Sequence, residues 1–278
     1  MMSTTLIVGC GDLGTEVGLR LASAGHRVIG WRRRLPAGDS PIEFEAVDVT
    51  SAVEVPDDVS RIVICLAPRR DGSDDYATTY LTGVRNLLDG MRVRPERAVL
   101  VSSTAVYGAL EGRVDEDTPI PAGSARARTL LAVERMFLDE LGDRGTVLRC
   151  GGIYGPGRTR LIDMVLAGEA VIPDGPAMTN RIHRDDAASA IVHLLGLADA
   201  APVYLGVDER PAEMAEVLAY LADRLRVPRP PTGTVSRERG GTRACDSSRL
   251  RATGFAFAYP DYRAGYADVI DAPRPRHP

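Results

Sequence analysis

The sequence contains no lysine. In a chain of 278 residues, the 34 residues of the lysine and arginine class are all arginine. Arginine stays protonated at neutral pH and cannot exchange a proton there. The absence therefore excludes any mechanism in which a lysine ammonium lowers the pKa of a neighbouring tyrosine.

Cysteine and histidine are sparse. The four cysteines lie far apart and form no C-x-x-C pair, which is typical of reduced intracellular proteins. The four histidines, at positions 26, 183, 193 and 277, have no metal-ligand spacing. We therefore expect neither disulfides nor a metal site.

Long apolar runs and basic stripes are also missing. No run approaches the roughly 20 residues that span a bilayer, and the first residues lack the pattern of a signal peptide. We expect a cytoplasmic protein without a membrane partner. The arginines are scattered and outnumbered by 38 carboxylates, so we expect no nucleic-acid partner.

Short apolar runs alternate with helical patterns through the first half of the chain. The runs predict buried strands at 5–8, 27–31, 61–66, 98–101 and 146–148, and the helical spacing predicts helices at 13–24, 76–91 and 124–141. This alternation favours an α/β fold with a doubly wound, Rossmann-like parallel sheet.

The second half is looser and predicts a small C-terminal substrate lobe. We assign residues 1–153 and parts of 177–207 to a dinucleotide-binding domain, and residues 154–176 and 208–278 to the lobe. A helix is expected at 212–225, before a proline cluster. Residues 272–278 are expected to form a frayed tail.

A glycine-rich turn follows the first predicted strand. Gly9, Gly11 and Gly14 have the G-x-G-x-x-G spacing that permits a tight turn, close approach to a pyrophosphate and packing of helix on strand. Asp12 and Leu13 complete the turn and open the helix, where backbone amides face the phosphates. The turn predicts a dinucleotide site.

Arginines follow the second predicted strand. An NAD-selective enzyme places an acidic residue there to bind the ribose hydroxyls. Arg32 and Arg33 would instead pair with the 2'-phosphate of NADP. The alternative is a solvated run of surface arginines.

Three motifs together resemble a known family. Val101 to Gly108, Leu148 to Gly157 and Arg181 to Ala187 are similar to the extended short-chain dehydrogenases and the NAD-dependent epimerase/dehydratase family. By resemblance, Asp48 meets the adenine, and the stretch Leu66-Ala67-Pro68 lines the central part of the cofactor. Ser103 then takes the place of the catalytic serine or threonine.

The usual Tyr and Lys pair of that family is absent. No tyrosine lies between Tyr107 and Tyr154, and the family spacing places Arg126 and Leu130 at the pair. The chain thus resembles an atypical branch whose proton must come from elsewhere. Tyr107 is the first candidate for that role, and the resemblance places four further residues at the substrate: Thr104, Tyr154, Arg158 and His183. Three of the substrate-side residues, Arg126, Arg158 and His183, are expected to line the pocket over the nicotinamide.

These observations predict an NADP-binding oxidoreductase or epimerase-like enzyme that acts on a small polar carbonyl or alcohol. Thr104 and Ala105 stand where related dehydratases carry an acidic pair, so dehydration is disfavoured. Two alternatives stay open: a non-catalytic redox sensor or scaffold, and an enzyme that uses the cofactor only structurally. The resemblance also implies a homodimer formed through helices 76–91 and 124–141.

Overall fold

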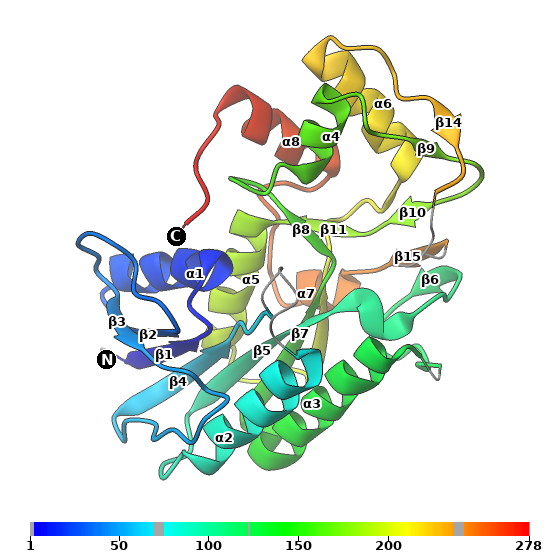
Figure 1. Cartoon of the computed structure of the whole chain (residues 1–278). Helices are drawn as coiled ribbons and strands as arrows, with labels where there is room; N and C mark the ends of the chain where they lie inside the picture. The colour runs from blue at the N-terminus through cyan, green and yellow to red at the C-terminus, as the bar shows by residue number, and fades with distance from the viewer. Residues whose placement is uncertain (1–2, 69–74, 122, 236–241, 278) are drawn as a thin grey trace.

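A computed structural model of the chain describes residues 3–68, 75–121, 123–235 and 242–277. Its centre is a seven-stranded parallel sheet with the order β12-β7-β5-β4-β1-β2-β3 (Figure 1). The strands are β1 (Thr4–Val8), β2 (Arg27–Arg32), β3 (Glu43–Ala46), β4 (Val59–Ile64), β5 (Arg97–Ser103), β7 (Gly145–Cys150) and β12 (Val203–Gly206). The order reverses at β1, so the expected doubly wound fold is confirmed.

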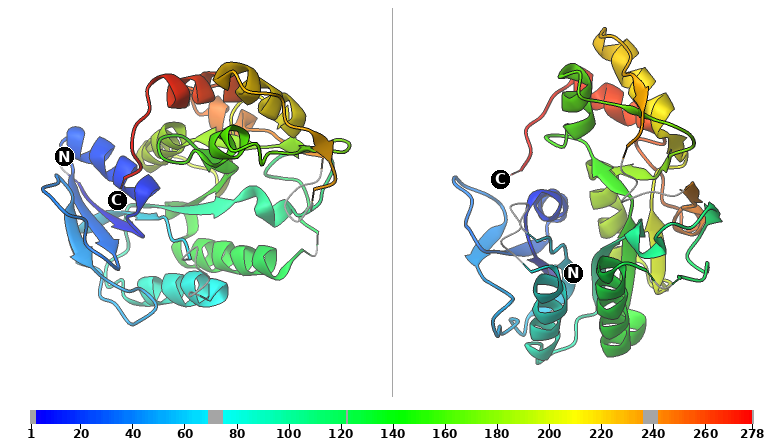
Figure 2. Two further views of the ribbon diagram at one scale, coloured as in Figure 1. Left: turned by 45° about the horizontal axis from the view of Figure 1, so that its top comes forward. Right: turned by 45° about the vertical axis from the view of Figure 1, so that its right-hand side comes forward.

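Helices cover both faces of the sheet. One face is covered by α1 (Asp12–Ser23) and α5 (Arg184–Gly196), and the other by α2 (Gly83–Asp89) and α3 (Ala125–Leu141) (Figures 1 and 2). Successive strand residues alternate between the two resulting cores. Ile7 belongs to the cluster under α1 and α5, whereas Leu6 and Val8 belong to the opposite one.

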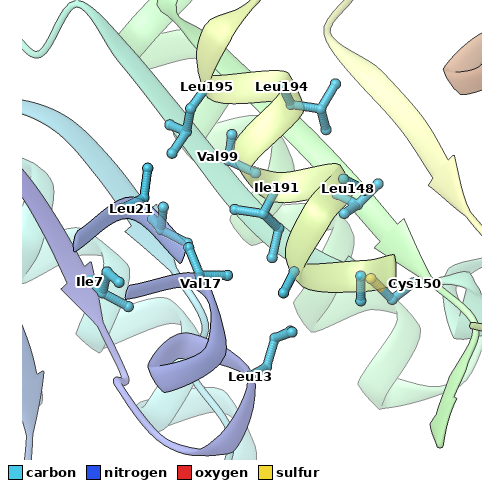
Figure 3. Packing of buried hydrophobic residues seen from close by; sticks show 14 of the residues in the cluster. Ile7, Leu13, Val17, Leu21, Val99, Leu148, Cys150, Ile191, Leu194 and Leu195 are labelled. Carbon is cyan, nitrogen blue, oxygen red and sulfur yellow. The ribbon is translucent and has the colours of Figure 1, made fainter. Parts of the chain in front are cut away.

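The cluster under α1 and α5 fixes where the phosphate turn lies. Leu13, Val17 and Leu21 of α1 meet Ile191 and Leu195 of α5 above the sheet (Figure 3). These positions recur every three to four residues, as the helical spacing requires. The start of α1 is thereby held at the carboxyl end of β1.

The predicted elements correspond to observed ones with small shifts at their ends. The expected helix 76–91 contains a π-helical turn, η1 (Thr78–Thr82), before α2, and the expected helix 212–225 begins later, as α6 (Met214–Leu225). Strands β3 and β12 were not predicted. Both are short edge strands, and β3 is mostly exposed and carries two glutamates.

Residues from both expected lobe segments form a third apolar cluster. It joins α4 (Arg160–Leu166), α6 and α8 (Tyr262–Asp271), which lie together above the sheet (Figure 1). Two short parallel pairs connect this region to the sheet: β8 (Gly152–Tyr154) with β11 (Arg181–His183), and β6 (Gly112–Val114) with β15 (Arg243–Cys245). The minor strands are β9 (Ile172–Pro173), β10 (Met178–Thr179), β13 (Ala212–Glu213) and β14 (Thr232–Gly233).

The end of the chain corrects one expectation. Residues 272–277 do not fray. They return to α1, and both views in Figure 2 place the C-terminus beside that helix. The ring of His277 lies 2.8 Å from the Glu16 carboxylate of α1 (Nε2 to Oε2). In the part of the chain that the structure describes, no helix combines the length and apolarity needed to cross a membrane.

Candidate functional site

A cavity of about 880 Å³ opens at the carboxyl ends of the central strands. In open α/β sheets this edge, at the point where the strand order reverses, is where ligands bind. The residues lining the cavity come from the turn before α1 and the start of that helix, the ends of β2, β4 and β5, the segments after β3, β7 and β8, the π-helical turn, α3 and the C-terminal tail. They include Gly9, Gly11, Asp12, Leu13, Gly14, Arg32, Arg33, Arg34, Asp48, Cys65, Leu66, Ala67, Tyr80, Ser102, Ser103, Leu130, Arg158 and Arg276.

Glycine is required at Gly9 and at Gly14 for different steric reasons. Gly9 has φ +79°, and a Cβ there would lie 2.8 Å from the carbonyl oxygen of Cys65. A Cβ on Gly14 would lie 2.9 Å from a methyl of Ile7, so this glycine lets α1 pack on β1. Gly11 has no such contact and faces the cavity. This open cradle at a helix N-terminus fits a diphosphate.

The arginines at and after the end of β2, Arg32, Arg33 and Arg34, line the cavity. Arg32, at the end of β2, has its guanidinium 5.7 Å from the ring centre of Phe44. Arg33 follows it along the same wall. Asp48 accepts hydrogen bonds from the Thr50 amide (3.0 Å) and hydroxyl (2.7 Å). Leu66 and Ala67 also line the cavity, but Pro68 is not among the described lining residues.

Ser103 ends β5, which β4 and β1 separate from β2 and its arginines in the sheet. Its hydroxyl accepts a hydrogen bond from the Ala105 amide (3.1 Å) and caps the short helix η2 (Thr104–Tyr107). Thr104 is buried and does not line the cavity. Of this motif, Val101, Ser102 and Ser103 line the cavity, whereas Thr104 does not.

Tyr107 is not placed as we expected. Its side chain is fully buried, and its hydroxyl donates to the Asp115 carbonyl (2.8 Å) and accepts from Arg149 (2.8 Å). Burial raises the pKa of Tyr107 to about 12, despite the opposing effect of Arg149. Tyr107 is not among the described residues that line the cavity, so this geometry does not support a catalytic role.

A buried charge network lies behind Ser103 and includes Tyr107. Arg149 on β7 forms an ion pair with Glu134 on α3 (2.7 Å), and the Ser102 hydroxyl donates to the same carboxylate. Both charged side chains are less than a tenth exposed. Removing one partner of such a pair leaves an uncompensated buried charge. The network fixes α3 against the sheet.

Arg126 and Leu130, which stand where the family carries its Tyr and Lys pair, have different surroundings. Leu130 of α3 lines the cavity and presents an apolar surface. Arg126, one turn earlier, is exposed and lies over the ring of Tyr76 at 5.1 Å. The expectation that Arg126 lines the pocket is therefore wrong.

Tyr80 is a cavity residue that the sequence reasoning missed. It lies in the π-helical turn η1, and its ring stacks on Tyr76 with centroids 4.8 Å apart. Burial raises the pKa of Tyr80 above its usual range, so the phenol stays protonated at neutral pH. Turns of π-helix inside α-helices occur frequently at functional sites. Helical periodicity indicates only that Tyr80 lies on the buried face of the expected helix 76–91.

Tyr154 and His183 are interior residues and do not line the cavity. Their rings meet edge to face at 5.4 Å, and Tyr259 stacks on His183 at 3.8 Å. Nδ1 of His183 accepts from the Asp185 amide (3.3 Å) and caps α5. Burial lowers the pKa of His183 to about 4. We expected His183 to line the pocket, and this is wrong.

Arg158 lines the cavity. Its Nε lies 2.5 Å from the Asp12 carboxylate. Within the described residues, no group of three or more histidine, cysteine or acidic side chains could hold a metal ion. Burial raises the pKa of the Cys10 thiol to about 11 and that of Cys150 to about 12, so neither thiol is primed as a nucleophile.

The sequence pattern of the NAD dependent epimerase/dehydratase family matches residues 5–205. The chain belongs to this family. Protein YeeZ of Escherichia coli strain K12 is a relative with 31% identity over 274 residues, which covers 94% of this chain and 97% of YeeZ. The family resemblance expected from the three motifs is thereby confirmed.

Solved structures agree with this family membership. A candidate NAD-dependent epimerase/dehydratase from Methylobacillus flagellatus superposes with a TM-score of 0.80, 32% identity and coverage of 98% and 99% of the two chains. UDP-glucuronic acid 4-epimerase from Bacillus cereus, in complex with UDP-glucuronic acid and NAD, gives a TM-score of 0.80 at 17% identity, with coverage of 96% and 98%. The second likeness shows the fold alone.

Proposed function

We propose that the protein is an NADP-dependent oxidoreductase or epimerase-like enzyme that acts on a small polar carbonyl or alcohol. One observation carries the proposal: a single cavity is lined by the glycine turn, by the arginines after β2 and by Ser103. The B. cereus relative binds NAD and a UDP-sugar, which supports a dinucleotide in the cavity. Its volume, about 880 Å³, is within the roughly 300–1,000 Å³ of single-ligand sites. A dinucleotide there favours a small co-substrate.

The arginine run is the basis for proposing NADP over NAD. Arg32 and Arg33 line the cavity where an acidic residue would otherwise bind the ribose. A guanidinium forms charge-assisted hydrogen bonds with a phosphate, each contributing roughly 1.5–3 kcal/mol. The 2'-phosphate is the only part of NADP that NAD lacks. Arg32 and Arg33 would therefore distinguish NADP from NAD.

The proposed chemistry assigns two hydroxyl groups of this chain to the substrate. The nicotinamide, when bound, supplies or accepts hydride. Ser103 would donate a hydrogen bond to the substrate oxygen, and Tyr80 would supply its proton, since it is the tyrosine that lines the cavity. In the reductive direction a carbonyl oxygen gains this proton, and the Arg126 guanidinium, which acts to lower the pKa of Tyr80, opposes the effect of burial.

Calorimetric titration tests the cofactor. NADPH should bind at least tenfold more tightly than NADH, and the double variant Arg32→Ala/Arg33→Ala should lose most of that preference. The matched control is Arg224→Ala/Arg229→Ala, which removes two exposed arginines of the lobe. Equal affinities of the wild type for the two dinucleotides would contradict the proposal.

A non-catalytic sensor or scaffold is the second candidate function. The absence of the family's Tyr and Lys pair favours it, because Leu130 and Arg126 cannot replace that pair. NADPH oxidation with a panel of aldehydes, ketones and sugars separates the two. Tight NADPH binding without turnover on any of them would favour the sensor.

A further inference from the structure

Asp12 places a negative charge in the glycine-rich turn, where an anionic ligand is expected to bind. It is the first residue of α1, its side chain is fully buried, and it lines the cavity. A helix N-terminus favours an anionic ligand such as a diphosphate. A carboxylate at the same place would repel that ligand, so the charge must be compensated.

Three guanidinium groups surround this carboxylate. Asp12 lies 2.5 Å from Nε of Arg158, 3.3 Å from Nη1 of Arg184 and 3.5 Å from Nε of Arg276. The backbone amide of His277 also donates to it (3.2 Å). Burial acts to raise the pKa of Asp12, but the hydrogen bond from Arg158 and the three positive charges outweigh burial and lower it. Arg184 also pairs with Glu16 (3.5 Å) and Asp185 (2.8 Å), so Arg158 and Arg276 are the two positive charges that exceed the single negative charge of Asp12.

Two of the three arginines also line the cavity. Arg158 follows β8, and Arg276 belongs to the tail 272–277, so they approach Asp12 from distant parts of the chain. Arg184 is 3% exposed and also pairs with Asp185. A guanidinium has five N–H donors, so a contact through Nε does not exhaust its capacity to bind phosphate.

The tail is held in place by contacts of its own. Arg274 pairs with Asp185 (3.1 Å) and Asp268 (2.6 Å). Gly157 has φ +62°, and a Cβ there would lie 2.4 Å from the Arg276 amide nitrogen. The backbone of the tail thus packs closely on the segment that carries Arg158.

We propose that Asp12 positions Arg158 and Arg276 as a clamp on the diphosphate of the bound nucleotide, and that the tail 272–277 is part of the binding site. Asp12 is then a positioning residue and not a direct ligand of the cofactor. The proposal rests on the proposed function for the identity of the nucleotide, but the clamp itself requires only a diphosphate.

Titration calorimetry with three ligands tests the clamp. NADPH carries the diphosphate and the 2'-phosphate, ADP carries only the diphosphate, and 2'-AMP carries only the 2'-phosphate. We expect Arg276→Ala, and a chain that ends at Asp271, to weaken NADPH and ADP binding at least tenfold and to change 2'-AMP binding less than twofold. Arg276→Lys should restore part of the loss. Arg229→Ala is the control, because Arg229 is an exposed arginine paired with Asp223 in the same lobe.

The outcomes distinguish this proposal from the function on which it rests. Wild-type affinity for NADPH and ADP in Arg276→Ala and in the shortened chain would overturn the clamp alone. ADP binding that depends on Arg276, without preference for NADPH over NADH, would contradict the NADP proposal and leave the clamp intact. A wild type that binds neither NADPH nor ADP would overturn both.

Discussion

The two tyrosines of the site differ in what their hydroxyls touch. The Tyr107 hydroxyl is held between a carbonyl and a buried guanidinium, whereas Tyr80 lines the cavity. Sequence position favoured Tyr107, because it follows Ser103 by four residues in a motif that the family shares. That spacing could not show that the intervening turn η2 directs the phenol into the core.

Replacing each tyrosine by phenylalanine should therefore have different effects. Tyr80→Phe should lower turnover at least tenfold, about 1.4 kcal/mol in barrier, with NADPH affinity unchanged. Tyr107→Phe should leave turnover near wild type and lower the free energy of unfolding by about 1–3 kcal/mol, because Arg149 loses a buried acceptor. Turnover assays and urea denaturation measure the two effects.

Tyr220→Phe is the control for this pair, since its hydroxyl only contacts the Arg263 carbonyl in the lobe. Full activity in Tyr80→Phe would remove Tyr80 from the mechanism. A large loss of turnover in Tyr107→Phe at unchanged stability would indicate that Tyr107 is the proton donor.

Helix α8 packs closely against Tyr154. A Cβ on Gly265 of α8 would lie 1.9 Å from the Tyr154 hydroxyl. Gly265→Ala should thus force α8 away from Tyr154 and lower the free energy of unfolding by about 1–3 kcal/mol, a usual cost of overpacking. Urea denaturation checks this.

The matched control is Gly196→Ala at the end of α5, where an added Cβ meets nothing within 4 Å. This substitution should be neutral or slightly stabilising, because alanine restricts the unfolded chain. If both variants lost equal stability, the contact between α8 and Tyr154 would not be the cause.

Elements with a strong hydrophobic period could be predicted, and others could not. Helix α3 could be predicted because Leu130, Val133 and Phe137 form a regular buried stripe. It begins only one residue after the expected start. Strand β3 was missed because three of its four residues are exposed. The π-helical turn at Tyr80 depends on tertiary packing, which local pattern does not encode.

At the scale of the whole molecule, the clamp was beyond the reach of sequence reasoning. The Asp12 and Arg276 contact joins residues that are 264 positions apart, and no local pattern marks either residue as the other's partner. The glycine turn and the arginine run could be found because each lies within a few residues of a predicted strand end.

Two buried titratable groups should shape the pH dependence of stability. Burial raises the pKa of Asp208 to about 8, against the opposing charge of Arg181. The raised pKa of Asp208 adds to the free energy of unfolding. This addition is fully present below pH 4, near the pKa of an aspartate in the unfolded chain, and is lost as pH rises through 8. The lowered pKa of His183, about 4, costs stability as pH falls below 6.5. The two effects oppose each other between pH 4 and 6.5.

We therefore expect the free energy of unfolding to fall between pH 6.5 and 8, by up to about 1.4 kcal/mol per pH unit. Asp208→Asn should flatten this slope, and Asp199→Asn, which removes an exposed carboxylate, should not. Urea denaturation at pH 6.5, 7.25 and 8 measures it. An identical slope in wild type and Asp208→Asn would refute the assignment.

The two edges of the sheet have a consequence for solubility. An edge strand offers unpaired backbone groups to other chains and is a template for aggregation. On β12 the Leu205 amide already donates to the Glu116 carboxylate (2.8 Å). Strand β3 is only four residues long and carries Glu43 and Glu45, and short edge strands with charged side chains disfavour pairing with a second copy. The residues that sequence patterns overlooked thus keep the sheet from growing between molecules.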